Sequence, residues 1–191
     1  MLILRDKGGN LDKVMHSTDW PCAVEAALVV PLLTIAAWTD IATRTIPDSI
    51  AAAIAVLGIA VRLFAGPSEL LISIAVALVL FALFVVLHAR GAFGGGDVKL
   101  AAAICLGLSP FAVYRFIYVT AMAGGVLALL HLAARRAVKN RPPSPPPPRG
   151  APLLRRVFCA ERWRIARHGS LSYGVAIAYG GIWAVMNELG N

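Results

Sequence analysis

Apolar residues run along this chain in long blocks, separated by short breaks that carry charges, glycine or proline. A helix needs roughly 17 to 25 mostly apolar residues to cross a bilayer. Blocks of about that length predict membrane-spanning helices, and we expect six of them: 22–39, 49–65, 69–89, 98–114, 115–134 and 170–187. The pattern therefore predicts an all-α fold, a polytopic transmembrane helical bundle.

The region 100–134 is one nearly unbroken apolar run, interrupted only by Ser109-Pro110 and by Arg115. It is too long for one span, and charge decides how it divides. The segment that follows it is rich in basic residues: Arg135, Arg136, Lys139, Arg141, Arg149, Arg155, Arg156, Arg162, Arg164 and Arg167. Such clusters stay in the cytoplasm. If the loops near Asp40 and Asp97 are cytoplasmic too, two spans must lie between Asp97 and this cluster, and both termini face outward.

Composition supports a membrane protein, since 59% of the residues are hydrophobic and only 15% are charged, with a mean hydropathy of +0.74. The excess of 18 Lys and Arg over 10 Asp and Glu follows the positive-inside rule better than it predicts nucleic-acid binding. The three cysteines form no close pair and the four histidines no ligand spacing, so we expect neither a metal site nor a thiol redox centre.

Two regions lie outside the predicted spans. Residues 1–21 mix charges of both signs and form an N-terminal outer arm; residues 22–191 form one membrane domain. That domain includes a cytoplasmic, proline-rich basic loop at 135–169. Within the loop, the pattern of 153–168 predicts a basic amphipathic helix on an anionic membrane surface, and recruitment of a cytoplasmic protein is the alternative.

Two carboxylates stand at the edges of predicted spans. Asp40 ends the first apolar block, and Asp97 stands just before the fourth. An ionisable group so close to hydrocarbon is costly and marks a functional site by default. Two carboxylates held close share one proton, so that one activates a water molecule while the other polarises a carbonyl. The pair therefore suggests an aspartic protease, and the sequence does not assign the two roles.

The residues around Asp97 suit a reactive centre. Gly94, Gly95 and Gly96 permit positive φ angles and remove side chains that would block a close approach of substrate or of the helix carrying Asp40. Lys99 follows two positions later and does not share a helix face with Asp97. We expect Lys99 to anchor the interface or to contact lipid or a substrate carboxylate.

The residues after Asp40 open the second span. Pro47 is expected in its first turn, with Asp48 or Ser49 capping the free amides. Arg44 either fixes the orientation of the helix or attracts an acidic residue of a substrate.

Three charged residues are expected at the outer side of the membrane. The long side chains of Arg62 and Arg115 should reach the lipid headgroups there. Glu25 should lie in the outer interface.

Three motifs in order resemble those of the type IV prepilin peptidases. Residues 39–48 read TDIATRTIPD, like the first aspartate motif, and residues 94–99 read GGGDVK, like the family's GxGDxK. Residues 172–178 read SYGVAIA, similar to PYGxAIA, which opens the final span in these enzymes and here contributes Tyr173 and Gly174. The chain departs from the family at Ser172, usually proline, and at Asp48, commonly asparagine. It resembles the short branch that serves Flp-type, tight-adherence pili and lacks a methyltransferase insert.

The resemblance implies a membrane aspartic endopeptidase with Asp40 and Asp97 as catalytic residues, no cofactor and no N-methyltransferase activity. Its substrate would be a type IV, Flp-like prepilin or pseudopilin, cut at the cytoplasmic face of a bacterial inner membrane. Membrane lipids and pilus-assembly proteins are the further partners expected. The alternatives are a catalytically silent membrane protein of pilus or secretion assembly, and a small ion-coupled transporter, which would favour acids at the bilayer midplane.

Overall fold

The computed structural model describes residues 8–91, 94–138 and 173–188. Within them the chain forms six helices: α1 (Gly8–Thr43), α2 (Asp48–Ala65), α3 (Pro67–Ala89), α4 (Gly95–Gly107), α5 (Pro110–Val138) and α7 (Tyr173–Glu188). The described part of the chain contains no strand, which confirms the all-α prediction. The predicted amphipathic helix at 153–168 and most of the proline-rich loop lie outside the described residues.

Four of these helices are long and apolar enough to cross a membrane: Ala23–Thr43, Asp48–Ala65, Pro67–Ala89 and Pro110–Arg136. With 13 residues, α4 is about 20 Å long, shorter than the hydrocarbon core of about 30 Å. The 16 residues of α7 also make a short helix. The protein is thus a multi-pass membrane protein, in which two of the six expected spans are short helices packed among longer ones.

The boundary between the fourth and fifth helices differs from the prediction. The chain breaks at Ser109, where the hydroxyl accepts a hydrogen bond from Ala112 N (3.3 Å) and the carbonyl accepts one from Val113 N (2.8 Å). Serine before a first-turn proline is a favourable helix start, so Pro110 begins α5. Arg115 does not interrupt the helix, since arginine is a good helix former; its guanidinium lies 4.4 Å from the centroid of the Phe111 ring.

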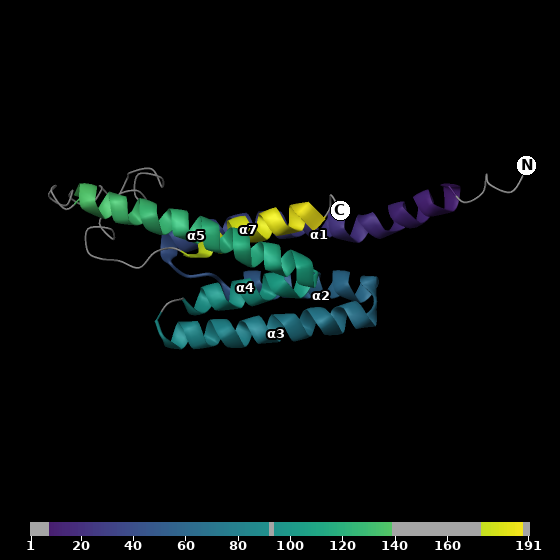
Figure 1. Ribbon diagram of the computed structural model, residues 1–191, viewed down its shortest axis with the longest axis horizontal. Helices are drawn as coiled ribbons and strands as arrows, with labels where there is room; N and C mark the ends of the chain where they lie inside the picture. The colour runs from purple at the N-terminus through teal and green to yellow at the C-terminus, as the bar shows by residue number, and fades with distance from the viewer. Residues whose placement is uncertain (1–7, 92–93, 139–172, 189–191) are drawn as a thin grey trace, which may run out of the picture.

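The helices form two groups of three. In one, α7 packs between α1 and α5; in the other, α4 packs between α2 and α3. Figure 1 shows that successive described helices run in opposite directions, so that α1, α3 and α5 run towards the end where α2, α4 and α7 begin, and α5 projects beyond it. We call this the motif end, because it holds Asp40 and Asp97, and we call the other the far end.

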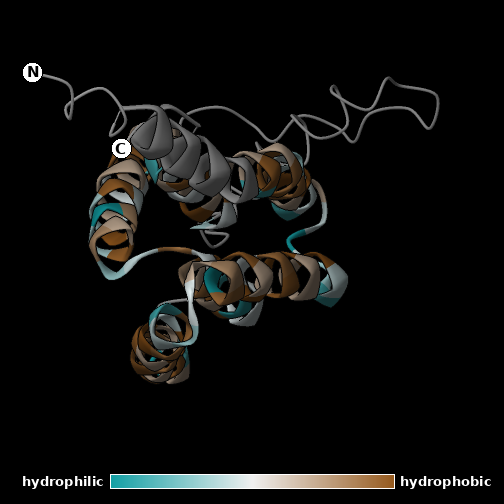
Figure 2. Cartoon of the chain, turned by 90° about the vertical axis from the view of Figure 1, so that its right-hand side faces the viewer, coloured by the Kyte–Doolittle hydropathy of each residue, from teal (hydrophilic) through white to brown (hydrophobic). Residues whose placement is uncertain are grey.

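Many large apolar side chains are exposed on the outside of the helices, and in Figure 2 much of the helical backbone carries the brown colour of hydrophobic residues. Phe64, Leu71 and Val79, for example, are 71%, 68% and 69% exposed, as expected of surfaces that face lipid tails. Inside, small residues let helices approach closely. A Cβ on Gly58 of α2 would lie 2.6 Å from the backbone nitrogen of Gly107 in α4.

A cluster of polar groups closes the far end. Arg62 donates from Nε to the carbonyl of Gly107 (2.7 Å) and from Nη2 to Glu188 (2.9 Å). Glu188 also accepts the amide of Ser109 (2.9 Å). We call Arg62, Gly107, Ser109 and Glu188 the far-end cluster. The carboxylate of Glu25 packs against Gly107, within reach of the charges of Arg62 and Glu188.

Two sequence predictions are corrected here. The Arg62 side chain is only 11% exposed and turns inward instead of reaching for headgroups. Glu25, expected in the outer interface, is 5% exposed. Arg62 turns inward because the Gly107 carbonyl at the end of α4 and the Glu188 carboxylate accept its hydrogen bonds there.

Candidate active site

A polar cleft of about 200 Å³ opens at the motif end, where α1 ends and both α2 and α4 begin. The cleft is lined by Asp40, Arg44, Thr45, Ile46, Asp48, Gly94, Gly95, Gly96, Asp97 and Lys99. Two acids separated by more than fifty positions in sequence therefore lie in one cavity. The charge of Asp40 acts on Asp97, so the two carboxyl groups influence each other.

Asp40 lies in the last turn of α1 and is 7% exposed. Its Oδ2 accepts a hydrogen bond from the backbone N–H of Gly174 (3.0 Å), in the first turn of α7. The N-terminus of a helix carries a partial positive charge that favours an anion. A Cβ on residue 174 would lie 2.6 Å from Oδ2, so this contact requires glycine.

Asp97 lies in the first turn of α4 and is 9% exposed. Its Oδ2 accepts a hydrogen bond from the backbone N–H of Gly94 (3.3 Å), the residue that caps the helix. Burial, and then the charge of Asp40, raise the pKa of Asp97 to about 6, while the Gly94 hydrogen bond and Arg44 act in the opposite direction. Asp97 therefore binds a proton much more readily than an ordinary aspartate does.

The glycine run acts through close approach and not through unusual backbone angles. Gly94 has φ −72°, and the described glycines with positive φ are Gly66 and Gly91, so the run does not use the positive φ that glycine permits. A Cβ on Gly94 would lie 3.0 Å from Oδ2 of Asp97, and one on Gly96 would lie 3.3 Å from Cβ of Ile46. Side chains here would crowd Asp97 and the loop after α1.

Arg44 ends α1 with φ +59°, a left-handed conformation that is uncommon for a residue other than glycine. Its amide still donates to the carbonyl of Asp40 (3.0 Å), which completes the last helical turn. The sequence offered membrane orientation or substrate attraction as its role. The structure places Arg44 in the cleft lining, where its charge acts on Asp97.

The start of α2 also differs from expectation. Pro47 occupies the cap position and not the first turn, and no side chain there makes a capping hydrogen bond. Asp48 instead accepts two bonds from the ammonium of Lys99, at 2.8 and 2.9 Å. Both side chains are exposed, at 75% and 54%, so they form an ion pair at the rim of the cleft. Neither residue bonds to Asp97.

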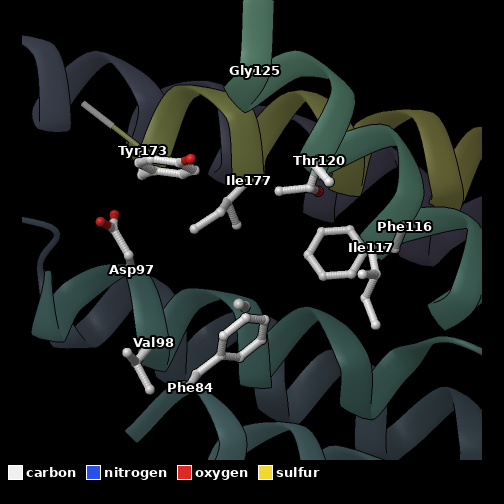
Figure 3. Close-up of a pocket in the computed structure, with 11 residues that line it drawn as sticks. Phe84, Asp97, Val98, Phe116, Ile117, Thr120, Gly125, Tyr173 and Ile177 are labelled. Carbon is white, nitrogen blue, oxygen red and sulfur yellow. The ribbon is translucent and has the colours of Figure 1, made fainter. Parts of the chain in front are cut away.

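A second cavity, of about 240 Å³, borders Asp97 on the side away from the glycine run. Its other lining residues are mostly apolar: Phe84, Val98, Ala101, Phe116, Ile117, Thr120, Ala121, Gly125, Tyr173 and Ile177. Figure 3 shows the Tyr173 ring and the Asp97 carboxylate at one end of this apolar groove. Gly124 backs the ring, since a Cβ there would lie 2.8 Å from it.

Of the residues that line the groove, the sequence motifs predicted Asp97 and Tyr173 as site residues, but they did not predict the apolar walls. Phe84, Phe116 and Ile117 are apolar residues inside apolar helices, and nothing in a single sequence separates them from side chains that face lipid. Among the described residues, no three His, Cys, Asp or Glu side chains are grouped as a metal ion would require.

The arrangement places in one cleft a carboxylate that accepts a hydrogen bond at a helix N-terminus and a carboxyl group whose pKa is raised. No curated protein and no solved structure matches the chain significantly. The sequence model of the type IV leader peptidase family matches residues 27–129, more than half of the 191 residues. The matched region contains Asp40 and Asp97 and stops before Tyr173 and Gly174. The protein therefore belongs to the type IV leader peptidase family.

Proposed function

We propose that this protein is an aspartic endopeptidase that removes the short basic leader of a type IV, Flp-like prepilin. Asp40 and Asp97 are its catalytic residues, and it acts at the cytoplasmic face of a bacterial inner membrane. One observation carries the proposal: two buried carboxylates from different helices line one cleft at the motif end. Membership of a leader peptidase family supports it.

The position of the cleft suits a substrate that lies in the membrane. A prepilin carries a basic leader followed by an apolar helix, and the bond between them lies where the chain leaves the bilayer. In this bundle the cleft opens at the ends of the helices, beside faces that are apolar along their length. A substrate helix can therefore stay in lipid while its scissile bond reaches the acids.

We assign the base to Asp40 and the acid to Asp97. The Gly174 amide donates a hydrogen bond to the Asp40 carboxylate at the N-terminus of α7 (3.0 Å), and the raised pKa of Asp97 favours its proton. Asp40 takes a proton from water as the water oxygen attacks the scissile carbonyl carbon, and Asp97 gives its proton to the carbonyl oxygen. When the intermediate collapses, Asp40 protonates the leaving nitrogen and a hydroxyl of the intermediate returns a proton to Asp97.

The proposal does not extend to methylation of the mature pilin. In bifunctional relatives that activity accompanies an insert with cysteine pairs, whereas Cys22, Cys105 and Cys159 stand far apart here. A transporter is a weaker interpretation, because Asp40 and Asp97 lie in terminal helix turns and not at the middle of the bundle, where an ion path would need them.

The test is coexpression with a prepilin, with processing followed on a gel. Asp40→Asn and Asp97→Asn should each reduce the rate by about 10²–10⁴-fold, the usual contribution of a catalytic acid or base. Glu69→Gln, in the first turn of α3, is the matched acid-to-amide control and should process normally. Full processing by either aspartate variant would refute the assignment. A native protein that processes no prepilin would favour the silent assembly role.

A further inference from the structure

Two cavities of opposite character meet at Asp97. The polar cleft, of about 200 Å³, carries the side chains of Asp40, Asp48 and Lys99, and the apolar groove, of about 240 Å³, is walled by side chains such as Phe84 and Ile117. Asp97 lines both cavities. A peptide whose scissile bond lies at Asp97 therefore has charged surroundings on one side of the bond and apolar surroundings on the other.

The groove has walls from several helices. Phe84 comes from α3, Phe116 and Ile117 from α5, and Tyr173 from α7. In Figure 3 the cavity extends from Asp97 and Tyr173 towards Phe116 and Ile117. Since a cavity of about 150 Å³ accommodates benzene, one of 240 Å³ has room for a single side chain of up to aromatic size.

We propose that the apolar groove binds the apolar side chain immediately after the scissile bond, and that it thereby sets the direction of the substrate. The leader then occupies the polar cleft, beside the carboxylates of Asp40 and Asp48. This inference rests on the proposed function and adds the residues that select the substrate. Asp97 lines the groove, so a side chain that fills the groove must belong to a residue next to the bond that Asp97 acts on.

Gly125 provides a direct way to fill the groove. It lines the cavity, and a Cβ built on it meets no atom within 4 Å. A larger side chain at this position therefore enters open space without displacing its neighbours. Its neighbour Gly124 does not offer this, because a Cβ there would strike the Tyr173 ring.

The experiment compares leader peptides that differ in the residue after the scissile bond: alanine, leucine or tryptophan. The native protein should prefer leucine to alanine by about 10–100-fold in kcat/KM, the range for apolar pockets. Gly125→Leu should lower kcat/KM for the leucine peptide about tenfold and leave the alanine peptide within about twofold. Ile117→Ala, which widens the groove, should raise the relative rate for tryptophan.

One control variant, on α5 like Gly125, accompanies these measurements. Leu129→Phe adds bulk to the same helix at a position that is 68% exposed and outside the groove lining, and should cleave all three peptides as the native protein does.

A binding readout is available in the inactive Asp97→Asn variant. A photo-crosslinking residue placed just after the scissile bond should attach to α5, and one placed just before it should attach to the start of α2. The reverse pattern overturns the direction. Unchanged preference in both Gly125→Leu and Ile117→Ala, or an equal loss for all peptides in Gly125→Leu, overturns the specificity role. If the native protein cleaves none of the peptides, the proposed function itself fails.

Discussion

The two ends of the bundle handle buried charge in opposite ways. At the far end, Arg62 and Glu188 neutralise each other, and both also bond to the backbone between α4 and α5. At the motif end, the buried groups Asp40 and Asp97 are both acids, and each accepts a hydrogen bond from a backbone N–H. Opposite charges held by several bonds stabilise a fold, whereas two acids in one cleft repel each other and share a proton.

This difference indicates that the far end mainly stabilises the fold, whereas the motif end holds the candidate catalytic groups. The far-end cluster joins the ends of α2, α4 and α7, so we expect it to act as a clamp on the fold. The motif end holds its acids at some cost in stability, which is common at catalytic sites. Substitutions at the far end should therefore alter stability first, and substitutions at the motif end should alter activity first.

The largest effect is expected at Gly174. Gly174→Ala places a methyl group 2.6 Å from the Asp40 carboxylate and should displace that group, with a loss of about 10²-fold or more in prepilin processing. The melting temperature of the purified variant should fall much less. Normal processing by Gly174→Ala would show that the position of the Asp40 carboxylate at the motif end does not control activity.

The next effect is expected at the far end. Glu188→Ala leaves Arg62 and the Ser109 amide without their carboxylate partner, so the free energy of unfolding should fall by about 2–3 kcal/mol. Thermal unfolding in detergent measures this loss. Glu188→Gln, which can still accept the Ser109 N–H, should lose less. Activity per folded molecule should stay near that of the native protein. A marked loss of activity in the molecules that remain folded would contradict a purely stabilising role for the far end.

A smaller, pH-dependent effect is expected at Asp97. Between its ordinary pKa of 3.8 and its raised pKa of about 6, the folded protein holds this proton while the unfolded chain releases it. Its contribution to the free energy of unfolding therefore falls as pH rises through that window and is level above it. Asp97→Asn should remove this dependence and raise the melting temperature at pH 7 by about 2–4 °C. A melting temperature that drops at pH 7 would show that the ionised acid stabilises the fold.

The smallest effect is expected at the rim of the cleft. Lys99 and Asp48 form an exposed ion pair, and exposed pairs contribute about 0.5 kcal/mol or less. A double-mutant cycle with Lys99→Ala and Asp48→Ala, followed by thermal unfolding, measures the coupling. A coupling well above 1 kcal/mol would mean that the Lys99–Asp48 pair at the motif end also contributes substantially to the stability of the fold.

The sequence predicted the second and third helices within a few residues, at 49–65 against Asp48–Ala65 and at 69–89 against Pro67–Ala89. It also put Asp40 and Asp97 at the same end, because two predicted spans lie between them. The predicted boundary between 114 and 115 is wrong, because Ser109-Pro110 forms a helix start and α5 begins at Pro110.

Hydropathy and motif order were readable from the chain alone, because the thickness of a bilayer and the cost of charge near it act on each segment separately. They established an all-helical membrane protein and its two conspicuous acids. Folding in three dimensions assigned the partners: Gly174 to Asp40 across 134 positions, Glu188 to Arg62 across 126, and a groove built from α3, α4, α5 and α7. These pairings depend on which helix faces meet, and that depends on the close packing of many small residues at once.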